Sequence, residues 1–431
     1  MSFFLELGRL VFQYIPLGFL ASAAVDPVTA GFLWLAVAMV WFQARRQAQT
    51  EQRLWGVVKN PPLSRTLTSM VYGAAGGLLG SLVLSYVGVP FSETSGDFMY
   101  LWVMALALSL LHPRFICFSY AAGLLGISTL LFGWPGIGVA QVTALVAVLH
   151  LVEAAMIRLD GGTSASPILV GRPGGEVVGG FSLQRFWPVP LTLLLATAHG
   201  VTGGQTIATP DWWPLIRVPG PLGLDPNAIL ALVPVVAAVG YTDVAVAEDV
   251  PAKVRRSSGH LALYAVTLLG LSLLADRSLA AAWAAVLFAP LGHEWVIWSE
   301  ARREQFAPAH WQPAGRGLRV LDVLPGTPAA AVGLASGHVL LAVDGQPVDS
   351  RDELHEALRT SPSYCVLEFQ TSPSRHLVRR LPAGVRDEGE MGLVLVPEPD
   401  EQPMWQMNTQ GAVARWLAQA MARLRGRPFT S

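Results

Sequence analysis

Long apolar runs recur before residue 300 of this chain and limit its possible folds more than any other feature. A helix needs about 20 mostly apolar residues to cross a bilayer, and several runs approach that length. Only 14% of the residues are charged, against about 25% in ordinary soluble domains. The runs predict a polytopic all-α membrane domain of about 8–10 helices over residues 1–299. Clear runs lie near 28–43, 66–89, 98–111, 115–133, 136–157, 227–247, 259–275 and 279–298, and weaker ones near 10–24 and 188–206.

Charges between the runs predict the orientation, because short cytoplasmic loops collect Lys and Arg. The loop 44–65 is rich in Arg and Lys, and 248–258 holds three more basic residues. Arg302 and Arg303 follow the last run. Alternation across the runs places everything after residue 299 in the cytoplasm. We expect a multi-pass protein of the cell membrane.

The overall charge excludes one class of partner. The formal net charge is −1, whereas nucleic-acid binding relies on a surplus of Lys and Arg that neutralises phosphates. We therefore expect the lipid bilayer and other proteins as partners, and no nucleic acid.

One predicted cytoplasmic loop has a β-rich pattern of its own. Two such runs flank Pro173-Gly174-Gly175 within residues 166–187, and Pro followed by Gly is typical of a type II turn. The pattern fits a β-hairpin, and a loop lying along the membrane surface fits it equally well.

The tail after residue 316 changes to a pattern of short strands, turns and capped helices. Residues 317–323 alternate with period two, as in a half-buried strand, and Asp344-Gly345 is typical of a hairpin turn. Ser350 and Glu353 are spaced as a capping box for a helix over 351–360. These elements predict a small α+β domain.

The motif VLPGTPAAAVGL, followed by GHVLLAVDGQPV, resembles the bacterial PDZ domain. His338 stands where that family usually has an acidic residue. The resemblance implies a PDZ domain at 317–397, joined to the membrane domain by a linker at 300–316.

PDZ domains bind a peptide or C-terminal ligand as an added β-strand. No glycine-rich binding strand precedes Gly317, but EMGLVLV near the end of the domain is a candidate. That arrangement resembles permuted PDZ domains of membrane proteases. The alternative is a strand that only closes the core. The predicted groove consists of Met391, Gly392, Leu393, Val394, Leu395 and Val396, facing Leu354 and Leu358 on the helix.

The C-terminal residues 404–426 have apolar positions at helical spacing and basic residues between them. A basic amphipathic helix can lie on an anionic membrane surface or in a partner's groove. A disordered basic tail is the alternative. The residues that would carry the contact are Arg415, Trp416, Arg423 and Arg425.

A broken metal motif lies in the last apolar run. His293-Glu294 begins an H-E-x-x-H pattern, which holds zinc when the second His shares its helix face, but the closing position is Ile297. Asp160 in an L-D-G motif precedes this pattern, whereas intramembrane metalloproteases place it afterwards. A site of His150, Glu153, His293 and Glu294 is chemically possible, but it lacks the expected ligand. We therefore predict no catalytic residue, no metal and no cofactor.

The order of these features resembles the MinJ family of division-site topological determinants. The segments that carry the resemblance are HLVEAAMIRLDGG, VVGGFSLQRFWPVPL and APLGHEWVIW, followed by the PDZ motif. It implies a non-catalytic scaffold that bridges DivIVA-like and MinD-like division proteins and is enriched at septum and poles. An intramembrane protease, a protease-regulating PDZ protein and a transporter are the alternative functions.

Overall fold

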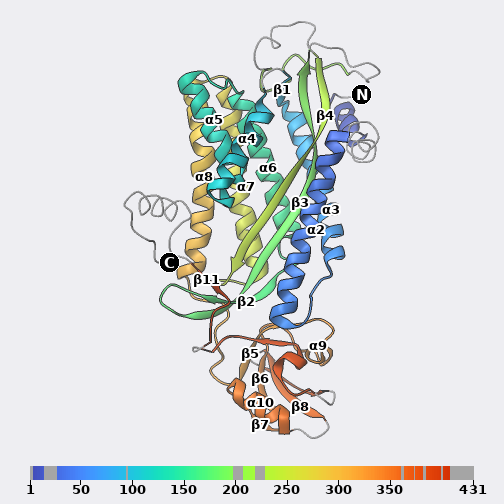
Figure 1. Ribbon diagram of the computed structural model, residues 1–431, viewed down its shortest axis with the longest axis vertical. Helices are drawn as coiled ribbons and strands as arrows, with labels where there is room; N and C mark the ends of the chain where they lie inside the picture. Colours follow the sequence, from blue (N-terminus) through green and yellow to red (C-terminus); the bar gives the residue numbers. More distant parts are fainter. Residues whose placement is uncertain are drawn as a thin grey trace.

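The computed structural model describes residues 3–13, 27–93, 96–197, 207–218, 229–360, 364–372, 374–381, 385–398 and 401–407. A helical N-terminal region, with two long strands running along it, occupies one end of the molecule, and a small domain of strands and short helices occupies the other (Figure 1). The predicted basic helix at 404–426 lies outside the described residues from residue 408 onwards. Its predicted contact residues Arg415, Trp416, Arg423 and Arg425 are therefore not described.

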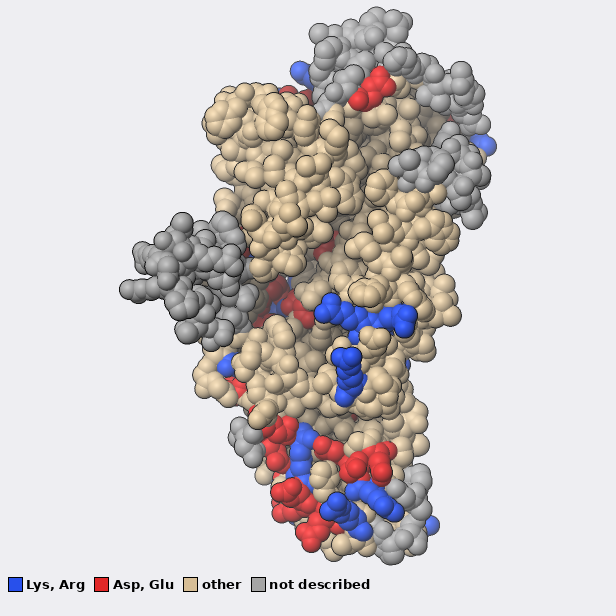
Figure 2. Space-filling model, viewed as in Figure 1, with Lys and Arg blue, Asp and Glu red and all other residues tan. Residues whose placement is uncertain are grey.

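Four described helices are long and apolar enough to cross a membrane: α3, α6, α7 and α8. The most buried of the four is α6, at the centre of the bundle (Figure 1). Much of the surface of the helical region shown in Figure 2 carries no charged side chain, while charges gather at the other end. The helices are α2 (Pro27–Trp55), α3 (Pro62–Val87), α4 (Asp97–Leu111), η1 (Pro113–Ile116), α5 (Phe118–Phe132), α6 (Val139–Asp160), α7 (Val250–Ala275) and α8 (Leu279–Phe306).

Local sequence signals explain several helix ends. Proline suits the first turn of a helix, where its missing N–H is not needed, and α3 and α7 both have Pro there. The side chain of Asp249 accepts a hydrogen bond from the Ala252 N–H at the start of α7, as N-cap residues do. Gly88 ends α3 in the left-handed conformation, which glycine adopts without a steric penalty.

Two segments predicted to be helical are strands instead. Residues 227–247 largely form β4 (Ile229–Ala245), and the described part of 188–206 belongs to β3 (Val177–Thr197). The two strands pair antiparallel along the whole of β4 and run beside α2 and α3 (Figure 1). Hydropathy cannot distinguish a long apolar strand from a helix. The deciding local features are prolines and β-branched residues, which disfavour a helix interior: Pro188, Pro190, Pro234, Val235, Val236 and Val239.

Small residues on α3 let these strands approach closely. A methyl group added at Gly73 would lie 2.1 Å from the Pro188 carbonyl oxygen, and one at Gly77 would lie 1.9 Å from that of Pro190. Any larger residue would therefore push β3 away. The Ser81 hydroxyl, one turn further along, accepts a hydrogen bond from the Thr192 N–H.

The first sheet extends from the helical region towards the small domain. Its strand order is β1-β3-β2-β11, and β4 also pairs with β3. The strands β2 and β3 form a hairpin, and both Gly174 and Gly175 in its turn have positive φ. The short strands are β1 (Pro90–Ser92), β2 (Ser166–Gly171) and β11 (Trp405–Gln406).

The small domain has a second sheet in the order β10-β5-β6-β8-β9, with β7 beside β6. Asp344 and Gly345 both have positive φ in the turn after β6, and Ser350 and Glu353 form the expected reciprocal capping bonds. The elements are β5 (Leu318–Val323), α9 (Pro328–Ala331), β6 (Val339–Val343), β7 (Gln346–Pro347), α10 (Arg351–Thr360), β8 (Cys365–Ser372), β9 (Arg375–Leu381), α11 (Glu388–Met391) and β10 (Leu393–Leu395).

The small domain is docked on the helical region by a mixed contact. The Lys59 ammonium, from the loop between α2 and α3, pairs with Asp322 at 2.6 Å and donates to the Ala165 carbonyl at 3.0 Å. Val394 and Val396 are buried in the same apolar cluster as residues of the helical region. The predicted organisation, a helical N-terminal region with candidate membrane spans followed by an α+β tail, is confirmed.

Candidate functional site

The predicted binding strand, β10, lies at the edge of its sheet. One side of it pairs with β5. The Val396 N–H donates to the Arg319 carbonyl oxygen in β5, and the Gly392 carbonyl oxygen accepts from the Leu324 N–H directly after β5. Backbone groups of an antiparallel strand alternate in direction, so those of Leu393 and Leu395 point away from β5. An added peptide strand would pair with this outer edge.

The side chains of the predicted groove are buried. Leu354 is 0% exposed and Leu358 2% exposed, and both share an apolar cluster with Met391, Leu393 and Leu395. Val394 and Val396 instead contact the cluster of the helical region. The groove between β10 and α10 is therefore closed in this structure. Peptide binding at these residues stays a prediction, and it requires α10 to move away from β10.

Arg351 fixes the start of α10 against the strand edge. Its guanidinium pairs with Glu388 at 2.5 Å and Glu401 at 2.7 Å, and lies 3.5 Å from the Leu395 carbonyl oxygen. Burial raises the pKa of Glu388, and the charge of Arg351 opposes that rise. The arginine thus connects the helix, the strand edge and the segment that follows the strand.

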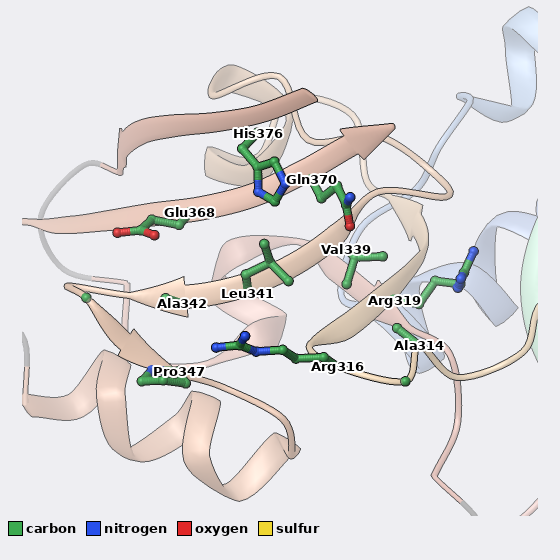
Figure 3. Close-up of a pocket in the computed structure, with 12 residues that line it drawn as sticks. Ala314, Arg316, Arg319, Val339, Leu341, Ala342, Pro347, Glu368, Gln370 and His376 are labelled. Carbon is green, nitrogen blue, oxygen red and sulfur yellow. The ribbon is translucent and has the colours of Figure 1, made fainter. Parts of the chain in front are cut away.

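A pocket of about 520 Å³ opens elsewhere on the same domain, beside the linker (Figure 3). Arg316 and Arg319 lie on one side of it, and Glu368 and His376 lie on the strands β8 and β9. None of the predicted peptide-binding residues lines it. The pocket is separate from the strand edge and carries charges of both signs.

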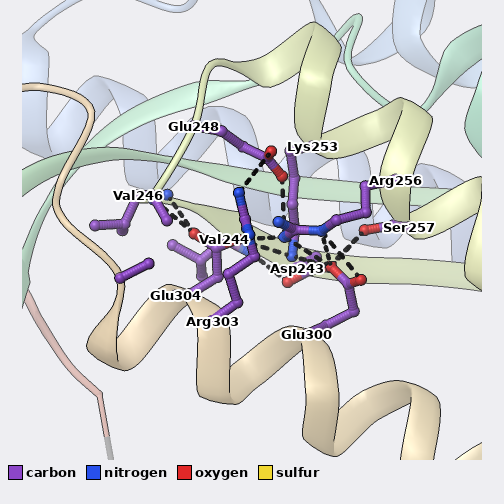
Figure 4. A network of polar contacts seen from close by, with 12 residues as sticks. Asp243, Val244, Val246, Glu248, Lys253, Arg256, Ser257, Glu300, Arg303 and Glu304 are labelled. Atoms are coloured by element: carbon purple, nitrogen blue, oxygen red, sulfur yellow. Dashed lines mark hydrogen bonds and ion pairs between the residues drawn. The ribbon is translucent and has the colours of Figure 1, made fainter.

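A network of charged side chains joins β4, α7 and α8 where these elements approach the small domain (Figure 4). The Lys253 ammonium is fully buried and lies 2.9 Å from Asp243, 2.8 Å from Glu300 and 3.2 Å from Glu304. Arg256 pairs with both glutamates as well. Glu304 also accepts the N–H groups of residues 246 and 247 at the end of β4. Because each charge has opposite partners, the network suits the rigid joining of helices.

The two acidic residues of the metalloprotease-like motifs serve structural contacts. Glu294 pairs with Arg114 at 2.6 Å and accepts the Tyr120 hydroxyl at 2.8 Å. Asp160 accepts the Arg185 guanidinium and, at 2.8 Å, the Trp187 indole N–H. Neither carboxylate lies in the group of possible metal ligands that the described residues form.

His150 and His293 do come together, and they meet a residue that the sequence analysis did not select. The Cys117 sulfur lies 3.3 Å from His150 Nε2 and 3.7 Å from His293 Nε2. The three residues come from α6, α8 and the turn before α5. The sequence suggests His150 and His293 as members of one possible site but not Cys117, because no spacing pattern connects Cys117 with residues so far along the chain.

Comparisons with known proteins place these features in context. The family model for the PDZ domain matches residues 319–370, which confirms the PDZ prediction. The chain is 26% identical to the cell division topological determinant MinJ of Bacillus subtilis over 241 residues, which make up 55% of each protein. It is 31% identical to a probable MinJ of Lacticaseibacillus paracasei over 85 residues, 20% of this chain and 23% of that protein. The chain thus spans about half the length of the first relative and less of the second.

Two further similarities cover smaller parts of the chain. The magnetosome formation protease MamE of Magnetospirillum gryphiswaldense is 47% identical over 51 residues, 12% of this chain and 7% of MamE. The crystal structure of the PDZ domain of an SdrC-like protein from Listeria monocytogenes covers 20% of this chain and 92% of its own, with 18% identity and a TM-score of 0.17. The chain thus combines a PDZ domain with helices long and apolar enough to cross a membrane, and it is similar to MinJ over 55% of its length.

Proposed function

We propose that this protein is a non-catalytic, membrane-anchored scaffold that recruits cell-division proteins, bridging a DivIVA-like and a MinD-like partner. The observation that carries the proposal is the docking of a PDZ domain on a helical region with candidate membrane spans, in a chain similar to MinJ over 55% of its length. A scaffold needs one part that stays in the membrane and another that binds a soluble partner. We assign the first role to the helical region and the second to the PDZ domain, and the Lys59–Asp322 pair and apolar contacts hold the two together.

The proposed orientation places the PDZ domain in the cytoplasm. Lys59 lies in the loop that touches the PDZ domain, Arg45, Arg46 and Arg53 lie in the second half of α2 before this loop, and Arg65 lies in the first turn of α3 after it. Short loops rich in Arg and Lys stay on the cytoplasmic side. The division proteins that the scaffold would bind are cytoplasmic, so this side is the one the function requires.

The proposed ligand site of the PDZ domain is the outer edge of β10. Exposed strand edges bind peptides through backbone hydrogen bonds, which require no particular side chain. The peptide would displace the Arg351 contact with Leu395 and separate α10 from β10. Specificity would then come from the apolar positions that the movement uncovers, Leu354 and Leu358 on α10.

Fluorescence imaging of the tagged full-length protein in dividing cells tests the proposal. A scaffold of the division site should concentrate at septa and poles. A chain truncated after residue 316 retains the membrane region and is the matched control for the contribution of the PDZ domain. A uniform distribution of the full-length protein around the membrane would contradict the proposal.

The protease alternative rests on the similarity to MamE, which is confined to 51 residues, 7% of that protein. A PDZ domain is a binding module, and by itself it supplies no catalytic group. The assignment as a non-enzyme would be wrong if the purified protein cleaved a membrane substrate and a substitution in its own chain abolished that cleavage.

A further inference from the structure

We propose that Cys117, His150 and His293 form a zinc site inside the helical region, with Glu153 supplying a further negative charge. The ligand atoms of the first three residues all lie within 4.8 Å of one another. Thiolate and imidazole are donors that zinc prefers, whereas magnesium and calcium prefer oxygen ligands.

The distances between the donor atoms fit a tetrahedral ion. Zinc bonds of about 2.3 Å to sulfur and 2.0–2.1 Å to nitrogen, at tetrahedral angles, place the two donors about 3.5 Å apart. The Cys117 sulfur lies 3.3 Å from the Nε2 atom of His150 and 3.7 Å from that of His293. The two rings approach edge to face with centroids 5.1 Å apart. An ion can therefore enter with only small side-chain movements.

Hydrogen bonds orient both imidazoles for metal binding. His150 Nδ1 lies 2.7 Å from the Val146 carbonyl oxygen, which can only accept, so this nitrogen carries the proton. His293 Nδ1 lies 3.4 Å from the Tyr120 oxygen, and the Tyr120 hydroxyl donates to Glu294. Each Nε2 atom is thereby left with its lone pair directed towards Cys117. Metal-binding histidines generally have a carbonyl or carboxylate partner on their other nitrogen, as His150 has directly and His293 has through the Tyr120 hydroxyl.

Glu153 completes the charge balance. It lies three residues after His150, which places both on one face of α6. A zinc ion with one thiolate, two neutral imidazoles and one carboxylate has no net charge. Neutrality matters here because an unbalanced charge in an apolar region has a large desolvation cost.

The site would join the connection between α4 and α5 to two longer helices, beside the Arg114–Glu294 and Tyr120–Glu294 contacts. Cys117 follows η1 in the connection between the short helices α4 and α5, while His150 and His293 lie on the longer helices α6 and α8. A bound ion would fix the α4–α5 hairpin to the bundle. This role does not depend on the proposed scaffold function.

Metal analysis of the full-length protein purified in detergent tests the proposal. Wild type and Cys365→Ser should contain stoichiometric zinc, because Cys365 lies in the PDZ core. Cys117→Ser and His293→Ala should lose it. Glu153→Gln should bind zinc on the order of tenfold to a hundredfold more weakly, as removal of a supporting partner does.

Two measurements on the wild-type chain keep the test valid if a variant does not fold. Cobalt added to the metal-free protein should give the near-ultraviolet charge-transfer band of a thiolate ligand, and zinc should protect Cys117 from alkylation. The absence of that band, together with equal alkylation rates with and without zinc, would overturn the proposal.

Discussion

The buried side chain of Asp160 connects several parts of the structure. Its carboxylate accepts the guanidinium of Arg185 and the indole N–H of Trp187, both on β3, and the hydroxyl of Thr163. Asp160 is the last residue of α6, so these bonds tie the central helix to the long strand. Such a set of partners explains an aspartate in an otherwise apolar run without any catalytic role.

Leu358 is buried because the groove is closed, so a charge at this position should destabilise the PDZ domain. Leu358→Glu should unfold the PDZ domain, because burying an unpaired carboxylate costs several kcal/mol. Leu358→Met is the control, since similar volume costs less than about 1.5 kcal/mol. Circular dichroism of residues 310–400, a segment with its own apolar core, measures the effect. A folded Leu358→Glu domain would show that this position opens to solvent.

At the scale of elements, the packing of α3 against β3 depends on two glycines. Gly77→Ala should lower the thermal stability of the protein in detergent, because the new methyl group would lie 1.9 Å from the Pro190 carbonyl oxygen. Gly270→Ala in α7 is the matched control. A methyl group there meets nothing within 4 Å, and alanine favours a helix over glycine by about 0.5–1 kcal/mol. Equal stability of the two variants would contradict the close approach.

The same elements show what the sequence could and could not predict. The helices α3, α6, α7 and α8 follow from apolar length, and the PDZ elements follow from turn and capping residues such as Asp344-Gly345 and Ser350. The strand β4 could not be predicted, because an apolar run of its length resembles a membrane helix and its pairing with β3 is a tertiary event. The position of Cys117 beside His150 and His293 could not be predicted either, since it depends on how the turn before α5 packs against α6 and α8.

For the whole molecule, the orientation in the membrane is the next testable property. A cysteine at Ser374, on the exposed surface of the PDZ domain, should resist impermeant thiol reagents in intact cells and react after lysis. A cysteine at Arg277, in the turn between α7 and α8, should react in intact cells. The reverse pattern would invert the orientation and with it the proposed access to cytoplasmic partners.

The central claim is that the membrane region and the docked PDZ domain together recruit a soluble division protein. The most direct measurement is the position of a fluorescent MinD-like protein in cells that make either the full-length chain or the chain truncated after residue 316. The account predicts septal and polar enrichment with the full-length chain and its loss with the truncated one, at equal membrane levels of both. Enrichment that persists without the PDZ domain, or that is absent with the full-length chain, would contradict it.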